Sequence, residues 1–232
     1  MYIYRCEFEL MEHVFFASRE VSDYFQTEAV VGNYALAYAL GFCQSEYYND
    51  GQIHYTRDLQ KLNEESIYVT PGTFTEKPSF VISRFNALSD SYWFQMAQNT
   101  VVVNRRSRAR PRPANFPQAG RIKLLAIGNR GLFYVTSHKQ INIPSYARLG
   151  KFMSKIKIFS QEQDFYEVET ENWNYRYFLN PNDLSGDTQL GTFDLMNVKP
   201  TPLVRNANLS GKFNRLSDET NLPVGMRFFT IN

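Results

Sequence analysis

The sequence contains little cysteine and little histidine, which narrows the chemistry open to it. Its 232 residues include only two cysteines, Cys6 and Cys43, and three histidines. Two scattered thiols cannot form a disulfide framework, and a zinc site needs about four well-spaced ligands. The sequence also has no glycine-rich phosphate loop and no pair of histidines at metalloprotease spacing. We therefore expect no metal and no cofactor, and a reducing, cytoplasmic setting.

Long apolar runs are also missing. The longest, near Tyr34 to Cys43, is too short to cross a bilayer, and the first residues carry charges where a signal peptide needs an apolar stretch. We expect no membrane contact and no export. Hydrophobic residues make up 43% of the chain and aromatic residues 16%, a composition typical of a globular protein rich in strands. We expect one domain, residues 1–232, with a core of its own.

Acidic residues are absent from a long central stretch, Ser91 to Gln161. This stretch carries 13 of the 25 lysines and arginines but none of the 23 acids, so the overall charge of +2 hides a strong segregation. An acid-free basic segment attracts polyanions, most often nucleic acid, because neutralised phosphates release their counterions. A solvated basic face without a partner is the alternative. The segment is rich in arginine, whose guanidinium binds phosphate bidentately and stacks on bases, and this favours RNA or DNA.

The pattern along the chain predicts an α+β fold made mostly of strands. Tyr2–Leu10 alternates apolar and charged residues as a half-buried strand does. Asn33 is the predicted N-cap of a helix over residues 34–40 that Gly41 ends, and a short helix is predicted around Asp58 to Glu65. Further strands are predicted at 67–70, 80–85, 100–103, 122–127, 131–136, 156–160, 165–169, 173–179 and 226–230.

The densest basic stretch is Asn104 to Gly120, which holds five arginines and three prolines between two predicted strands. Prolines at this frequency forbid a regular helix or a central strand, so we expect an exposed arm or hairpin tip. An apolar ring among the prolines is poorly placed for burial and well placed to stack on a base. The predicted RNA-binding residues, in this arm and just after it, are Arg105, Arg106, Arg108, Arg110, Arg112, Phe116, Arg121 and Lys123.

Evidence for catalysis is thin. His138 precedes Lys139 and lies near Tyr134 and Tyr146 in sequence, and such groups serve metal-free ribonucleases as base and cation. The sequence gives no orienting group for them. We therefore predict no catalytic residue, and a metal-independent endoribonuclease stays open as the alternative.

Four segments resemble the Csc-one family, the Cas-five-type subunit of type I-D CRISPR Cascade complexes. They are Tyr2–Leu10, Val14–Glu20, Asn33–Gly41 and Phe116–Lys123. The resemblance implies an RRM-like (ferredoxin-like) core with a protruding basic thumb hairpin, which would fall at about residues 98–125. It also implies a single copy that grips the 5′ handle of the guide RNA.

The same resemblance implies partners. These are the Cas-seven-type backbone subunit (Csc-two), the Cas-ten-type large subunit, and target DNA near the protospacer-adjacent motif. A separate nuclease normally cuts the guide in such systems. We therefore expect a non-catalytic RNA-binding subunit in antiviral defence. The alternatives are the endoribonuclease above and a generic single-strand RNA-binding domain.

Overall fold

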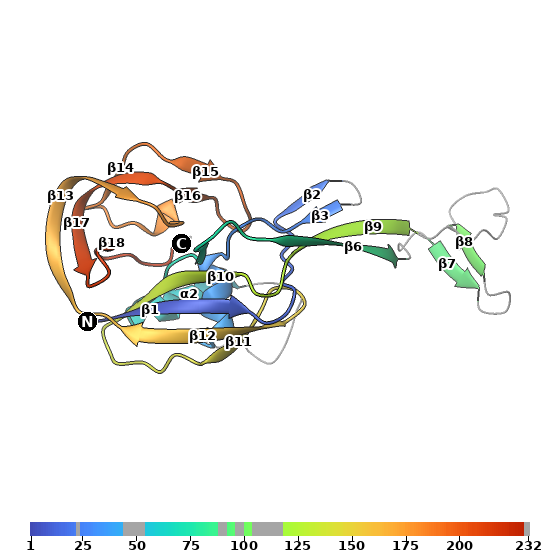
Figure 1. Ribbon diagram of the computed structural model, residues 1–232, viewed down its shortest axis with the longest axis horizontal. Helices are drawn as coiled ribbons and strands as arrows, with labels where there is room; N and C mark the ends of the chain where they lie inside the picture. The colour runs from blue at the N-terminus through green and yellow to red at the C-terminus, as the bar shows by residue number, and fades with distance from the viewer. Residues whose placement is uncertain (22–23, 44–53, 88–91, 96–99, 104–117, 230–232) are drawn as a thin grey trace.

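The computed structural model describes residues 1–21, 24–43, 54–87, 92–95, 100–103 and 118–229. Its centre is an antiparallel sheet in the order β11-β12-β1-β10-β4, with β5 also paired to β10 (Figure 1). These strands are β1 (Tyr2–Leu10), β4 (Ile67–Val69), β5 (Thr73–Phe74), β10 (Arg130–Ser137), β11 (Tyr146–Leu149) and β12 (Ser154–Glu162). Both β1 and β4 are antiparallel to β10, so they run parallel to each other.

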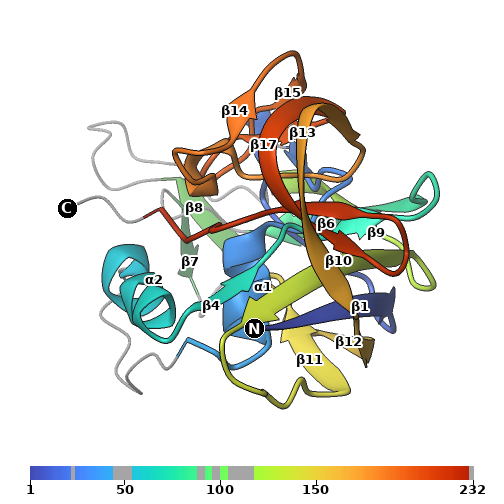
Figure 2. The same cartoon turned by 90° about the vertical axis from the view of Figure 1, so that its left-hand side faces the viewer.

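Two helices lie in the connection between β1 and β4. They are α1 (Asn33–Ala39) and α2 (Tyr55–Glu64), and they pack on one face of the sheet (Figure 2). The alternation predicted for β1 is confirmed, because Tyr4, Cys6, Phe8 and Leu10 are buried while Glu7 is exposed. Phe8 lies beside Leu36 of α1, since a Cβ added at Gly72 would touch both. The even-numbered residues of β1 therefore face the helices.

Only the N-terminal end of α1 differs from the prediction. The N-cap is Gly32 and not Asn33, whose side chain instead donates a hydrogen bond to the buried carboxylate of Asp183 at 2.7 Å. At the other end Gly41 stops the helix as predicted, with a φ of 75° and its N–H bonded to Tyr38. The N–H of Phe42 then reaches the carbonyl of Ala37, which completes a Schellman cap.

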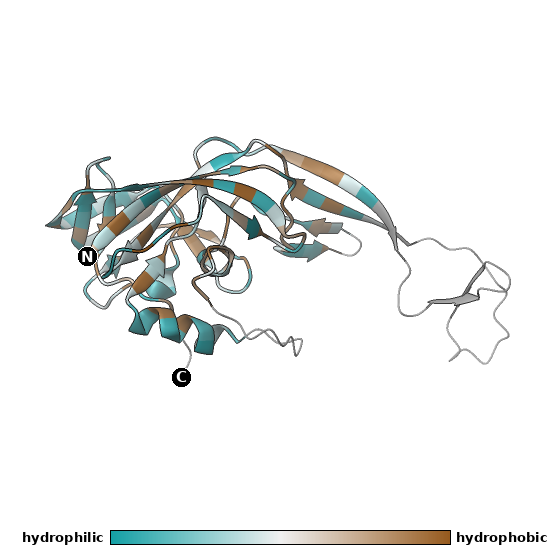
Figure 3. Cartoon of the chain, turned by 90° about the horizontal axis from the view of Figure 1, so that it is seen from below, coloured by the Kyte–Doolittle hydropathy of each residue, from teal (hydrophilic) through white to brown (hydrophobic). Residues whose placement is uncertain are grey.

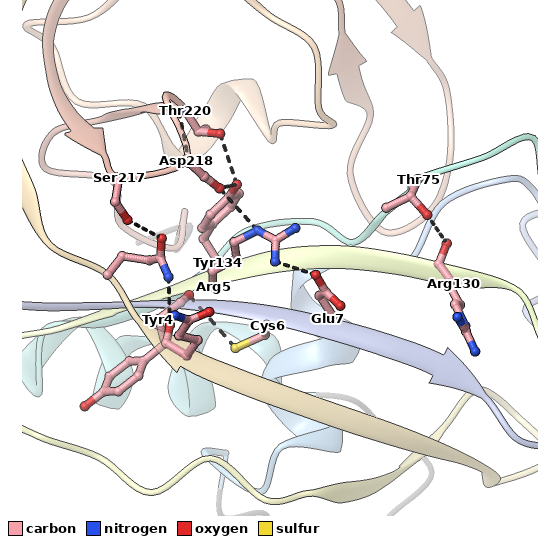
Figure 4. A network of polar contacts seen from close by, with 12 residues as sticks. Tyr4, Arg5, Cys6, Glu7, Thr75, Arg130, Tyr134, Ser217, Asp218 and Thr220 are labelled. Atoms are coloured by element: carbon pink, nitrogen blue, oxygen red, sulfur yellow. Dashed lines mark hydrogen bonds and ion pairs between the residues drawn. The ribbon is translucent and has the colours of Figure 1, made fainter.

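A second sheet covers part of the other face of the central sheet. It contains β13 (Phe165–Tyr175), β14 (Gln189–Leu190), β17 (Ala207–Leu216) and β18 (Asn221–Pro223). Arg5 of β1 pairs with Asp218 at 3.2 Å, and the Tyr134 hydroxyl donates to the same carboxylate at 2.8 Å (Figure 4). Buried residues of both sheets belong to one continuous hydrophobic cluster.

The C-terminal part corrects two predicted strands. The strand predicted over 173–179 ends at Tyr175, and Leu179 forms only an isolated bridge with Val204. Residues 226–229 are not a strand, because the N–H groups of Arg227 and Phe229 are bonded to Asp183 rather than to a neighbouring strand. The other elements here are η2 (Pro181–Asp183) and the ribbon of β15 (Asp194–Met196) with β16 (Leu203–Arg205).

A third sheet, in the order β2-β3-β9-β6, extends away from the body (Figures 1 and 3). Its strands are β2 (Arg19–Val21), β3 (Tyr24–Gln26), β6 (Phe80–Ala87) and β9 (Gln118–Leu125). β6 and β9 form a long antiparallel ribbon, and β7 (Tyr92–Gln95) pairs with β8 (Thr100–Val103) between them in sequence. The strand predicted at 122–127 is β9, which spans 118–125 and so includes the last three residues of the predicted arm, and residues 104–117 of that arm lie outside the described residues.

Candidate nucleic-acid interface

The register of the third sheet places three cations on one face. Arg84 of β6 lies opposite Arg121 of β9, and Lys123 lies two residues further along β9. Because side chains alternate between the faces of a strand, these three share a face. We call this group, with Tyr24 of β3 and Phe80 of β6, the ribbon face. Tyr24 is the partner of Arg121 across the parallel pairing of β3 with β9.

Aromatic rings hold two of these cations. The Arg121 guanidinium lies 5.3 Å from the centre of the Tyr24 ring, and the Lys123 ammonium lies 3.9 Å from that of Phe80. Cations over ring faces are attracted by the ring quadrupole, by about 0.5–1 kcal/mol at exposed sites. Within the described ranges no ion pair forms at Arg84, Arg121 or Lys123. The ribbon face therefore presents positive charge that no described carboxylate neutralises.

The ribbon face also has an apolar component. Ile82, opposite Lys123, is 59% exposed, and it lies between Phe80 and Arg84 on the same face of β6. Alternating cations and apolar groups on an open strand surface fit a ligand that is both charged and flat, as the nucleotides of a single strand are. The geometry favours binding along the ribbon rather than in a closed pocket.

The structure locates two of the predicted RNA-binding residues. Arg121 and Lys123 lie side by side on the ribbon face. The other six lie outside the described residues: Arg105, Arg106, Arg108, Arg110, Arg112 and Phe116. In sequence, residues 104–117 join β8 directly to β9, so the arginine-rich segment is continuous with the strand that carries Arg121 and Lys123.

Sequence reasoning missed Arg84, Tyr24 and Phe80. The alternation in Phe80–Arg84 was sufficient to place Phe80, Ile82 and Arg84 on one face of the predicted strand. What the sequence did not indicate was the pairing of β6 with β9 across thirty intervening positions, 88–117, because no turn motif marks so distant a partner. Tyr24 lies on a strand too short for the pattern to reveal.

The groups considered for catalysis are not brought together. His138 and Lys139 are exposed where β10 ends, and His138 lines a cavity of about 180 Å³ with Asn63, Asn214 and Arg227. The Tyr134 hydroxyl is bonded to Asp218 and lies 3.1 Å from that of Thr220, and burial raises its pKa strongly. Neither Tyr134 nor Tyr146 lines the His138 cavity.

The two thiols are buried and free. Burial raises the pKa of Cys43 to about 12 and that of Cys6 further still, so neither thiol is ionised near neutrality. Among the described residues no three histidine, cysteine or acidic side chains are grouped to hold a metal ion. No helix in this part of the chain is long and apolar enough to cross a membrane.

Taken together, the fold and the ribbon face define a strand-rich α+β protein in which Arg84, Arg121 and Lys123 lie together on an extended two-stranded ribbon. A family model described as "Type I-D CRISPR-associated protein Cas5/Csc1" matches residues 1–230, and the chain belongs to that family. The resemblance found in the sequence is thereby confirmed. Membership places the chain in a CRISPR ribonucleoprotein complex of antiviral defence, in a family whose members are generally non-catalytic Cascade subunits.

Among solved structures, the chain is similar to one chain of the cryo-EM structure of the Type III-B Cmr-beta bound to cognate target RNA and AMPPnP. The TM-score is 0.48 with 12% sequence identity, over 89% of this chain and 86% of that one. No curated protein sequence matches the chain.

Proposed function

We propose that this chain is the non-catalytic subunit of a type I-D Cascade complex that grips the 5′ handle of the guide RNA. The observation that carries the proposal is the ribbon face, where Arg84, Arg121 and Lys123 lie together without a described carboxylate partner. Single strands are bound by grooves or faces where cations follow the backbone and rings stack on bases. The arginine-rich segment 104–117 continues this surface in sequence.

The topology supports an RRM-like core with the ribbon as its thumb. The strand order β12-β1-β10-β4, with helices between the parallel strands β1 and β4, matches the split βαβ arrangement of ferredoxin-like folds. One element departs from that arrangement, because an irregular segment and the strand β11 connect β10 to β12 where such folds have a second helix. The ribbon β6–β9, followed outward by 88–117, serves as the thumb in this proposal.

The proposal extends to partners. We assign to the chain one copy per complex, contacts with the Cas-seven-type backbone subunit and the Cas-ten-type large subunit, and a position near the protospacer-adjacent motif of target DNA, in the cytoplasm. The support is family membership together with the segregated charge, since the basic middle suits nucleic acid and the acidic ends are free to face protein. Base pairing by the guide supplies sequence specificity in such complexes, so the protein reads shape and backbone.

The test is the salt dependence of repeat-RNA binding. Arg84→Gln, Arg121→Gln and Lys123→Gln together should lower the slope of log affinity against log salt by about 2, since each phosphate contact on a single strand contributes roughly 0.7. Lys212→Gln is the matched control, because Lys212 is an exposed strand lysine that lies opposite Glu169 in the acidic half. A second variant replaces the arm arginines by alanine, namely Arg105, Arg106, Arg108, Arg110 and Arg112.

Three results are distinguishable. Tight binding to repeat RNA without cleavage, lost in the ribbon variant but kept in the control, supports the proposal. Equal affinity for repeat and scrambled RNA would leave only a generic single-strand binder. Cleavage of the repeat would replace the proposal by the endoribonuclease.

A further inference from the structure

The outer face of the central sheet, turned away from α1 and α2, is covered at one side and bare at the other. On β10, Leu132 and Tyr134 are buried. Two strands away, on β12, Phe159 is 64% exposed, and Tyr146 on the edge strand β11 is 52% exposed. The second sheet therefore covers the β10 side of this face and leaves β12 and β11 open.

Register places two aromatic rings and two lysines together on the bare side. Tyr146 lies opposite Lys157, and Lys155 and Phe159 flank Lys157 on the same face of β12. We call Tyr146, Lys155, Lys157 and Phe159 the sheet-face patch. Tyr146 and Phe159 are diagonal neighbours across the two strands, a distance of roughly 7–8 Å in an antiparallel pair. The patch therefore offers two neighbouring aromatic rings, and Lys157 lies next to both of them.

Its lysines have no described carboxylate partner, although acids are close. Glu9, which lies opposite Lys157 on β1, pairs with Arg130 at 3.2 Å. Glu7, opposite Phe159, accepts a hydrogen bond from Arg5, which also binds Asp218 (Figure 4).

The third nearby acid, Glu12, is also paired with an arginine. Glu12 accepts the backbone N–H of Lys155 at 2.7 Å and pairs with Arg148 at 3.5 Å. Each neighbouring acid is thus bound to an arginine. The Lys155 ammonium instead lies 4.4 Å from the centre of the Tyr146 ring.

We propose that the sheet-face patch is a second binding surface for single-stranded nucleic acid, separate from the ribbon face. Phe159 stacks on a base, and Lys157 and Lys155 bind the phosphates that flank it. A single strand supplies a flat ring and a negative charge at each repeat, which is the pairing that this patch presents. An acidic peptide would satisfy the lysines but would leave the exposed Phe159 ring without an apolar partner of its own.

The two surfaces can be tested apart because they share no strand. Phe159→Ala in the full-length protein should weaken binding of short oligonucleotides by about 5- to 150-fold, the effect of losing one stacked base. Tyr166→Ala is the matched control, since Tyr166 is 62% exposed on strand β13 and lies between Phe165 and Glu167 rather than between lysines. Oligouridine and oligothymidine are measured side by side, so that an RNA source is distinguished from a DNA source.

Photocrosslinking gives the second readout. Oligonucleotides that carry thiouridine or thiothymidine should crosslink to the peptide that contains Phe159, and the crosslink should persist when Arg84, Arg121 and Lys123 are changed to glutamine. Loss of binding in Phe159→Ala with either oligonucleotide supports the patch and names its source. Wild-type affinity in Phe159→Ala and no crosslink to β12 would overturn it, and would leave the ribbon proposal standing.

Discussion

Asp183 is a buried carboxylate at the junction of three segments, and its charge should make the stability of the fold depend on pH. One of its oxygens accepts the N–H of Phe229 at 2.8 Å, and the other accepts the Tyr68 hydroxyl at 2.9 Å and the Asn33 amide at 2.7 Å. Burial raises the pKa of Asp183 from 3.8 to about 7, although these donated hydrogen bonds oppose the shift. In this protein the cost of burial exceeds the gain from three donors.

The sign of the effect follows from the raised pKa. Between pH 4 and 7 the folded protein holds a proton on Asp183 that the unfolded chain has released, so stability falls as pH rises. The slope is about −1.4 kcal/mol per pH unit within this window, and the whole transition amounts to about 4 kcal/mol. The contribution is fully present below about pH 4, and it is lost as the pH rises through about 7.

The assay is urea unfolding of wild type and Asp183→Asn in half-unit steps between pH 4.5 and 6.5. The variant cannot titrate at this position, so the wild-type free energy of unfolding minus that of the variant should fall by about 1.4 kcal/mol per pH unit. Asp187→Asn changes an exposed carboxylate close by and serves as control. A flat difference would refute the reasoning, because it would mean that Asp183 is ionised in the folded protein and that its hydrogen bonds outweigh burial.

Three further predictions concern the core, the histidine and assembly. Phe8→Ala should cost about 3–5 kcal/mol in urea unfolding, because the ring is buried against Phe74 and Phe133 and leaves a cavity; a loss below about 1 kcal/mol would mean that the site collapses. His138→Ala should leave guide RNA maturation intact in cells, and accumulation of uncut precursor would contradict this. The isolated protein should aggregate, because its exposed apolar side chains tend to associate. Co-expression with the backbone and large subunits and guide RNA should recover it, because these side chains are then covered. A well-behaved monomer that never co-purifies with RNA or those subunits would argue against this prediction.

Local sequence patterns predicted most of the central sheet. The predictions were wrong where contacts with segments distant in sequence determine the local structure. The alternation of Tyr2–Leu10 and the helix stop at Gly41 are properties of neighbouring residues, and both were predicted correctly. Asn33 is of a residue type that is typical of an N-cap, but its side chain donates a hydrogen bond to Asp183, 150 positions away. Residues 226–229 have strand composition, but the N–H of Arg227 donates to the backbone carbonyl of Asp183 and the N–H of Phe229 donates to its carboxylate. One buried acid thus explains two wrong predictions, and no sequence pattern indicated it.

The candidate site was predicted only in part, because one of its cations is contributed by a segment that is distant in sequence. Charge segregation pointed to residues 91–161, and Arg121 and Lys123 lie on an exposed strand of that stretch. Arg84 falls outside the acid-free segment, between Glu76 and Asp90 in sequence, and reaches the ribbon face only because β6 pairs with β9. Composition identifies a basic stretch but does not identify which distant cation joins it.

Basic and acidic residues that are separated in the sequence are separated in space only where strand pairing permits it. The acid-free segment supplies β10, β11 and all of β12 except its last residue, Glu162. However, β1 lies between β12 and β10 and brings Glu7 and Glu9 into the middle of the sheet. Arg130 on one side neutralises Glu9, and Arg5 of β1 itself binds Glu7. The lysines on the far side of β1 are left without a described carboxylate partner because these arginines bind the acids. The positive surface on β12 therefore depends on Arg130 and Arg5, and exchanging either for glutamine would free a carboxylate to pair with Lys157 and weaken any polyanion bound there.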